Sequence, residues 1–152
     1  MGARTYPNKP RAYVDLDGVL ADFDRQAKAL RLPPSEAKGR AGFFVSLPPV
    51  SGMLRGIESL EELGFDVWIA SKIPASNPYA ATEKLLWVRE ALPPRLHDKV
   101  IITPDKGELG RPGDILIDDH PEWANAENFG GRVIRFVDWV QAINDIILEG
   151  AA

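Results

Sequence analysis

The sequence predicts a three-layer α/β fold, Rossmann-like in its layers, with a mostly parallel five-stranded sheet. Five short runs rich in Val and Ile, bounded by Gly, Pro or Asp, alternate with stretches whose apolar residues recur at helical spacing. Strands that alternate with helices usually pair in parallel and are covered on both faces. A length of 152 residues suits one domain with one core. We therefore expect a single domain over residues 1–152, with a small cap insert at about residues 24–50.

The strands are expected at residues 12–15, 66–71, 100–103, 115–118 and 133–136. Helices are expected at residues 22–30, 53–63, 79–92, 121–128 and 139–148. Gly64 ends the second of these helices, and Pro121 suits the first position of the fourth. The segment at 24–50 is rich in Pro and Gly, and so long a connection in a compact domain is usually functional. It should lie over the carboxyl edge of the sheet.

Composition narrows the function classes. A net charge of −4 offers no basic field for a nucleic acid polymer, whereas a small phosphorylated substrate needs only a few local cations. The absence of cysteine excludes disulfides, a thiolate zinc site and a cysteine nucleophile. No apolar run is long enough to cross a membrane, and residues 1–10 lack the apolar core of a signal peptide. We expect a cytoplasmic protein in which residues 1–10 are a lead-in.

Acidic pairs close two of the predicted strands. Asp15 ends the first strand and Asp17 lies two residues beyond it, and Asp118 ends the fourth strand with Asp119 directly after it. Ligands of open α/β sheets bind at the carboxyl ends of strands, where gathered carboxylates repel one another unless a cation lies between them. Residues two apart on a strand face the same side, so Asp15 and Asp17 can act together, and Gly18 permits a sharp turn behind them. A capping Asp would explain one such residue and not a pair.

Asp118 and Asp119 diverge because they are adjacent, so one is expected to bind metal and the other to support it. Oxygen ligands alone indicate Mg²⁺ rather than zinc. A turn-forming pair before His120 is the plainer alternative. His97 and His120 lack metal-ligand spacing and are interpreted as loop or packing residues.

Two further side chains fit a phosphate site. Ser71 ends the second strand and can donate to a phosphate oxygen, although Ser ends many strands. Lys106 follows the third strand and can neutralise both an aspartate and a phosphoryl group. Lys84 competes for that role, but its helical setting favours a surface ion pair.

These motifs together resemble the haloacid dehalogenase-like (HAD) phosphohydrolases, whose four motifs occur in the same order: Asp-x-Asp, a hydroxyl residue, Lys and an acidic pair. Within that superfamily the chain looks most similar to the 5′(3′)-deoxyribonucleotidases. The resemblance covers residues 11–136, and its matching segments are Asp15-Leu16-Asp17-Gly18-Val19-Leu20-Ala21-Asp22-Phe23, Phe43-Phe44, Leu47-Pro48, Glu83-Lys84, Trp87-Val88, Asp105-Lys106 and Leu116-Ile117-Asp118-Asp119-His120-Pro121.

The resemblance implies a Mg²⁺-dependent phosphomonoester hydrolase that forms an aspartyl-phosphate, with a nucleoside monophosphate as the small phosphorylated substrate. Asp15 would be the nucleophile and Asp17 the proton carrier. Mg²⁺ would be held by Asp15, the Asp17 backbone carbonyl and Asp119, with Asp118 behind. Ser71 and Lys106 would grip the phosphoryl oxygens, and the leaving group would be bordered by three aromatic residues, Phe23, Phe43 and Phe44.

Two departures from the family pattern bear on substrate choice. Lys72 follows Ser71 where the family has Thr followed by Ser, and the insert is shorter than the cap of the animal enzymes. Three alternatives stay open. A phospho-receiver domain would carry its acidic pair early and a lone Asp on a middle strand. A non-catalytic binding protein would keep costly clustered carboxylates without using them. A HAD phosphatase for another small phosphomonoester would share every motif.

Overall fold

A computed structural model describes residues 9–150, so most of the expected lead-in lies outside the described residues. Its five strands form one sheet in the order β3-β2-β1-β4-β5, and every neighbouring pair is parallel, as predicted. The central strand β1 is therefore flanked by β2 and β4, which places the two acidic strand ends side by side. The strands are β1 Arg11–Asp15, β2 Asp66–Ser71, β3 Val100–Ile102, β4 Ile115–Asp118 and β5 Arg132–Arg135.

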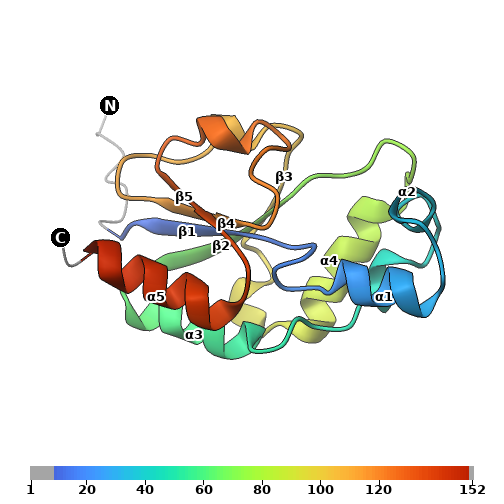
Figure 1. The fold of residues 1–152 in the computed structure, drawn as a ribbon, viewed down its shortest axis with the longest axis horizontal. Helices are drawn as coiled ribbons and strands as arrows, with labels where there is room; N and C mark the ends of the chain where they lie inside the picture. The colour runs from blue at the N-terminus through green and yellow to red at the C-terminus, as the bar shows by residue number, and fades with distance from the viewer. Residues whose placement is uncertain (1–8, 151–152) are drawn as a thin grey trace.

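The helices confirm the alternating pattern. They are α1 Phe23–Ala29, α2 Pro34–Ala37, α3 Met53–Glu62, α4 Ala80–Ala91 and α5 Trp139–Gly150, with short 3₁₀ turns at η1 Phe44–Ser46, η2 Pro94–Leu96, η3 Lys106–Glu108 and η4 Ala126–Asn128. Figure 1 shows α3 and α5 side by side against the sheet, and α1 and α2 at the end of the molecule beside α4. None of the helices within residues 9–150 has the length and apolar character needed to span a bilayer.

The two faces of the sheet are covered unequally. One face carries Val14, Ile69 and Ile117 into a large core shared with α3, α4 and α5. The other face carries Tyr13 and Leu116 into a smaller cluster, closed by residues on and beside η3 and η4. The alternation of side chains along each strand produces this division. This second face is therefore covered by 3₁₀ turns and loops, whereas the first face is covered by α-helices.

Close packing of α3 on α5 fixes the loop that follows β1. A Cβ on Gly56 of α3 would lie 2.1 Å from Trp139 Cε3, so glycine is what lets the indole lie against the helix backbone. The buried indole Nε1 then donates to the carbonyl of Val19, at 3.0 Å. Residue 19 belongs to the turn behind Asp17, so this core contact holds the turn of the acidic motif in place.

The insert at 24–50 contains α1, α2 and η1 and is pinned at its base. Asp22 N donates to Pro48 O at 2.7 Å, and Val50 N donates to Leu20 O at 2.8 Å. Asp22 also caps α1, because its side chain accepts from Arg25 N. The two ends of the insert are therefore joined directly beyond the acidic motif.

The prediction of a helix at residues 121–128 was wrong, because only Ala126–Asn128 is helical and it forms the 3₁₀ turn η4. Ala124 and Asn125 have φ values of 52° and 54°. Two successive residues in the left-handed region cannot continue a right-handed helix. Pro121 is compatible with a helix start, but the backbone turns before a helix can form.

Candidate active site

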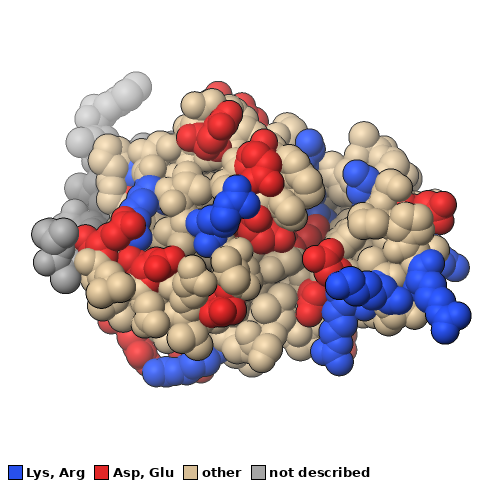
Figure 2. Space-filling model, in the orientation of Figure 1, with Lys and Arg blue, Asp and Glu red and all other residues tan. Residues whose placement is uncertain are grey.

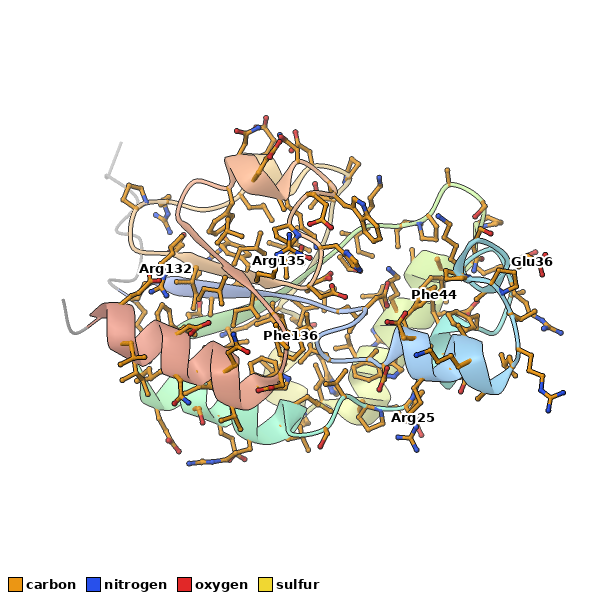
Figure 3. All side chains as sticks on the ribbon, in the orientation of Figure 1. Arg25, Glu36, Phe44, Arg132, Arg135 and Phe136 are labelled. Atoms are coloured by element: carbon orange, nitrogen blue, oxygen red, sulfur yellow. The ribbon has the colours of Figure 1, made fainter. Side chains whose placement is uncertain are left out.

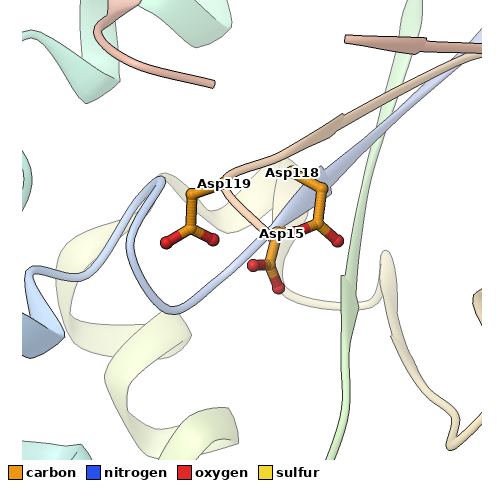
Figure 4. Close-up of side chains that lie close together, drawn as sticks. All are labelled: Asp15, Asp118 and Asp119. Carbon is orange, nitrogen blue, oxygen red and sulfur yellow. The ribbon is translucent and has the colours of Figure 1, made fainter. Parts of the chain in front are cut away.

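Three carboxylates meet at the carboxyl ends of β1 and β4. Asp15, Asp118 and Asp119 each offer an oxygen atom such that these atoms all lie within 4.8 Å of one another (Figure 4). Asp15 and Asp118 are buried, and Asp119 is half-buried. The neighbouring positions of β1 and β4 in the sheet bring the two motifs together, as the sequence predicted.

Lys106 supplies the cation of this cluster. Its ammonium donates to Asp15 Oδ1 at 2.9 Å and to Asp118 Oδ2 at 2.8 Å, and the residue is 4% exposed. Burial disfavours the charged lysine, but attraction from Asp15 and Asp118 outweighs it and raises the pKa of Lys106. The predicted lysine therefore lies at the acidic cluster and is held there by two charge-assisted hydrogen bonds.

One lysine does not balance three carboxylates. Burial is the largest cause that raises the pKa of Asp15 well above its usual range, and repulsion from Asp118 adds to it while Lys106 opposes it. Burial likewise raises the pKa of Asp119. The cluster thus has an excess of negative charge, and its donors are oxygen atoms only. Such a set suits a hard divalent cation.

Asp118 and Asp119 have different environments. Both oxygens of Asp118 are occupied, one by Lys106 and the other by His120 N at 2.8 Å. Asp119 lies beside Asp15, and its nearest cationic partner is the His120 ring, at 3.7 Å. A Cβ on Gly18 would lie 2.0 Å from Asp119 Oδ2, so this glycine, with φ of 84°, leaves room for the carboxylate. Asp119 is therefore the less tightly held carboxylate of the pair and the better placed to bind a cation.

Asp17 and Ser71 are joined by Lys84, which corrects the expectation that Lys84 is a surface residue. The Lys84 ammonium donates to Asp17 Oδ2 at 2.9 Å, to Ser71 Oγ at 2.9 Å and to the carbonyl of Lys72 at 2.6 Å. Only 1% of Lys84 is exposed. The structure thus places two lysines in the site, Lys106 at the acidic cluster and Lys84 on the side of Asp17.

The burial of Lys84 has a signal in the sequence. Ala80, Trp87 and Val88 lie four before, three after and four after Lys84, so all four share one face of α4, and all four are buried. A lysine on an apolar helix face needs acceptors for its ammonium. The strand ends provide them.

Asp17 retains one free carboxylate oxygen. Among buried side-chain atoms of residues 9–150, Asp17 Oδ1 is the one without a hydrogen-bond partner. Ser71 accepts from Lys84, so its hydroxyl proton remains available for donation to a ligand. Both residues therefore have a group that a phosphorylated substrate could use.

The loop that carries Lys106 is locked to the loop before η4. Lys106 N donates to the carbonyl of Ala124 at 2.8 Å, and Asp105 Oδ1 accepts from both Gly107 N and Asn125 Nδ2. Gly107 lies so close to Asn125 that a Cβ would be 2.3 Å from Nδ2. Ala124 and Asn125, whose left-handed backbone prevents the predicted helix, thus support the loop that carries Lys106.

The three predicted aromatic residues form one cluster, with Phe43 and Phe44 in the cap and Phe23 directly before it. Phe23, Phe43 and Phe44 have ring centroids 5.0 to 6.2 Å apart, and Phe43 and Phe44 are each 2% exposed. The Lys84 ammonium lies 4.7 Å from the centroid of Phe44. Figure 3 shows Phe44 within the cap, whereas Arg25 projects away from it. The rings therefore form a wall that is linked to Asp17 through Lys84, with Phe23 as its more accessible member.

The remaining candidates lie at the rim. Lys72 is exposed and contributes only its carbonyl to Lys84. His97 bonds to the carbonyl of Leu92, as a packing residue would. His120 contacts Asp119 and stacks on Trp123 with ring centroids 3.9 Å apart, so it lies beside the acidic cluster.

Comparison with known proteins identifies a family. Residues 37–144 match the family described as 5′ nucleotidase, deoxy (pyrimidine), cytosolic type C protein (NT5C). A candidate 5′(3′)-deoxyribonucleotidase of Vibrio phage KVP40 is 29% identical over 151 residues, covering 93% of this chain and 87% of the relative. One from Bordetella bronchiseptica is 33% identical, covering 71% and 73%. The human cytosolic type 5′(3′)-deoxyribonucleotidase is 28% identical, covering 72% and 70%.

Proposed function

This chain belongs to the NT5C family of 5′-nucleotidases, and we propose that it is a Mg²⁺-dependent phosphomonoester hydrolase for deoxyribonucleoside monophosphates. The observation that carries the proposal is the meeting of Asp15, Asp118 and Asp119 at the edge of the sheet, with Lys106 bonded to Asp15 and Asp118. Membership of this family argues against the alternative that the chain is a phospho-receiver domain. A phosphatase for another small phosphomonoester has the same chemistry and differs only in the leaving group.

Asp15 is proposed as the nucleophile. One of its carboxylate oxygens attacks phosphorus, the bond from phosphorus to the leaving oxygen breaks, and Asp15 becomes an aspartyl-phosphate. Lys106 is hydrogen-bonded to Asp15 and is placed to neutralise charge on the transferring group. Ser71 has a hydroxyl proton to donate to a phosphoryl oxygen.

Asp17 is proposed as the proton carrier. Its Oδ1 has no partner, whereas Oδ2 is held by Lys84, so the carboxyl group is oriented with one oxygen free. It gives its proton to the leaving oxygen in the first step. In the second step it takes a proton from the water that attacks phosphorus and releases Asp15.

Asp15, Asp119 and the backbone carbonyl of Asp17 are proposed to hold Mg²⁺, with Asp118 in support. The fit rests on three clustered carboxylates whose repulsion one lysine does not offset, and on the position of Asp119 beside Asp15. A bound Mg²⁺ would neutralise the repulsion between Asp15 and an anionic phosphate. Asp118 is occupied by Lys106 and His120 N and so suits the supporting role.

This aromatic wall is proposed to border the leaving group, with Phe23 as its accessible ring. Residues 24–50 would form a small cap on a single domain that spans the chain. A cytoplasmic location, a nucleoside monophosphate rather than a nucleic acid polymer as partner, and the absence of a membrane partner remain parts of this proposal.

A panel of phosphomonoesters tests the proposal. It should contain dUMP, dTMP, 3′-nucleotides, a sugar phosphate and phenyl phosphate, each assayed for phosphate release with MgCl₂ and with EDTA. We expect the deoxyribonucleotides to be hydrolysed in MgCl₂, and we expect EDTA to abolish this turnover. Hydrolysis of the sugar phosphate alone would indicate a different substrate class, and no hydrolysis of any member would favour a binding protein.

A further inference from the structure

One face of α4 connects the cap to the catalytic edge, and we infer that Glu83 on this face determines which leaving groups the enzyme accepts. The inference rests on the proposed function and extends it. Glu83 contacts neither the acidic cluster nor the phosphate-binding groups described above. It acts as a positioning residue, through the cap segment at 42–47 that carries Phe43 and Phe44.

Glu83 grips the backbone of that segment with both carboxylate oxygens. Oε2 accepts from Gly42 N at 3.1 Å, and Oε1 accepts from Val45 N at 3.3 Å. The residue is 7% exposed and forms no ion pair with any residue in the range 9–150. A buried carboxylate is costly unless its oxygens are satisfied, and here two backbone amides and the amino end of α4 satisfy it.

The chemistry of the contact requires a carboxylate. Two N–H donors point at one side chain, so that side chain must offer two acceptors and no donor of its own. Glutamine has the same reach, but its amide nitrogen would oppose one of the backbone N–H groups. The contact therefore specifies Glu83 rather than any polar residue of that size.

Trp87, one turn further along α4, holds the other end of the same segment. Its Nε1 donates to the carbonyl of Leu47 at 2.8 Å, and the side chain is buried. Glu83 and Trp87 thus fix residues 42 to 47 at three backbone positions. Because this segment carries Phe43 and Phe44 and is held at both ends to one helix, the wall that these rings form is fixed and does not move as a free lid.

Lys84 ties this wall to the reacting groups. It lies between Glu83 and Trp87 in sequence, holds Asp17 and Ser71, and has its ammonium 4.7 Å from the Phe44 ring. The distance from the wall to Asp17 is therefore set through a single helix. Because Asp17 must protonate the leaving oxygen, the wall and the proton carrier face the same part of the substrate, which is the nucleoside.

Loosening the wall should affect large leaving groups and spare small ones. A nucleoside gains binding energy from the wall, whereas phenyl phosphate depends mostly on the phosphate site. The ratio of kcat/KM for dUMP to kcat/KM for phenyl phosphate measures that difference. We expect Glu83→Gln to lower the ratio about tenfold, the size of one lost hydrogen bond to a charged group, mainly through KM for dUMP.

The control is Glu90→Gln, an exposed glutamate on the same helix. Trp87→Phe, which keeps the ring and removes the donor, should lower the ratio in the same direction. Hydrogen exchange of the backbone amides at 42–46 should be faster in Glu83→Gln and unchanged in Glu90→Gln. This exchange does not depend on activity, so it still tests the contact if the wild type hydrolyses neither substrate and the proposed function fails.

A selective fall for dUMP together with faster exchange at 42–46 supports the inference. An equal fall for both substrates would overturn it, because Glu83 would then be needed for the whole fold or for the chemistry itself. An unchanged ratio in both Glu83→Gln and Trp87→Phe would also overturn it.

Discussion

The carboxyl edge of the sheet and the cap are built on different principles. At the edge, charged side chains are buried and paired: Lys106 joins Asp15 to Asp118, and Lys84 joins Asp17 to Ser71. In the cap, the interior is an aromatic cluster and the charged residues are outside. Strand pairing positions the first region, whereas hydrogen bonds from side chains of α4 to the cap backbone hold the second. The difference matches the proposed roles, in which the edge carries out the phosphate chemistry and the cap recognises the leaving group.

The two regions also differ in charge. The cap at 24–50 has five exposed basic residues and two acidic ones, in a chain whose net charge is −4. Figure 2 shows basic side chains gathered over the end of the molecule that carries α1 and α2. The basic residues are Arg25, Lys28, Arg31, Lys38 and Arg40, and none of them forms an ion pair with another residue in the range 9–150. The cap therefore presents positive charge beside an acidic body.

The largest expected effect comes from the edge. Asp15→Asn removes the proposed nucleophile while preserving shape, and we expect turnover of every substrate to fall by more than about a thousandfold. Steady-state phosphate release from dUMP and phenyl phosphate measures it. Asp98→Asn, an exposed aspartate, is the control. Near-wild-type rates in Asp15→Asn would show that the chemistry does not depend on this carboxylate.

Lys84 tests the connection between the regions. In Lys84→Met, Asp17 and Ser71 lose their shared donor, and Asp17 is left with an unpaired carboxylate. We expect kcat to fall about a hundredfold and the free energy of unfolding to fall by about 3 kcal/mol, the usual cost of breaking a buried pair. Denaturant unfolding and kcat are measured against Lys72→Met, an exposed neighbour of the same site. Equal stability of the two variants would contradict the account.

The acidic cluster predicts a pH dependence of stability in EDTA. The pKa of Asp15 is raised in the folded state above its usual value of 3.8, so the folded protein binds that proton more tightly than the unfolded chain does. The contribution of Asp15 to the free energy of unfolding therefore falls as the pH rises from 3.8 through the raised pKa. Asp119, whose pKa is also raised, has the same effect. MgCl₂ should remove the loss, because the cation replaces the proton.

The measurement is the melting temperature between pH 3.8 and neutrality, for the wild type and Asp15→Asn, in EDTA and in MgCl₂. Carboxylates with lowered pKa values, such as Asp66, have the opposite dependence and cancel in the difference between the two proteins. A difference that does not change with pH in EDTA would sink this interpretation of the cluster.

The smallest effect is expected from the surface of the cap. Replacing Arg25, Lys28 and Arg31 by glutamine should lower kcat/KM for dUMP about two- to threefold at low salt, because a local positive field attracts the dianionic substrate. Screening should abolish the difference at high salt. The comparison is made across a salt series, and a loss independent of salt would indicate a direct contact instead.

The gathering of carboxylates at the edge was predictable from sequence, whereas the shape of the cap was not. Asp15, Asp118 and Asp119 lie at ends of adjacent strands, and parallel pairing alone brings such ends together. Lys84 was misjudged because a helix surface was assumed, although its spacing from Trp87 and Val88 placed it on a buried face. The failed helix at 121–128 depended on left-handed residues Ala124 and Asn125, which no periodicity signals.

The cap resisted prediction for a physical reason. Its shape depends on long-range backbone contacts, in which Glu83 bonds to Gly42 and Val45 and Trp87 bonds to Leu47. Such contacts have no local pattern, since the partners are about 40 residues apart. The sequence indicated which aromatic residues belong to the cap, and only the structure shows that Phe43 and Phe44 face inward.

The most direct test of the central claim is to trap the covalent intermediate on Asp15. Wild-type protein is mixed with dUMP and MgCl₂, quenched in acid within the first turnover, digested and analysed by mass spectrometry. The account predicts a phosphoryl group on the peptide that contains Asp15, which is absent with EDTA and absent in Asp15→Asn. Phosphate release at the wild-type rate with the phosphoryl group on another residue, or with none trapped while Asp15→Asn remains active, would contradict it.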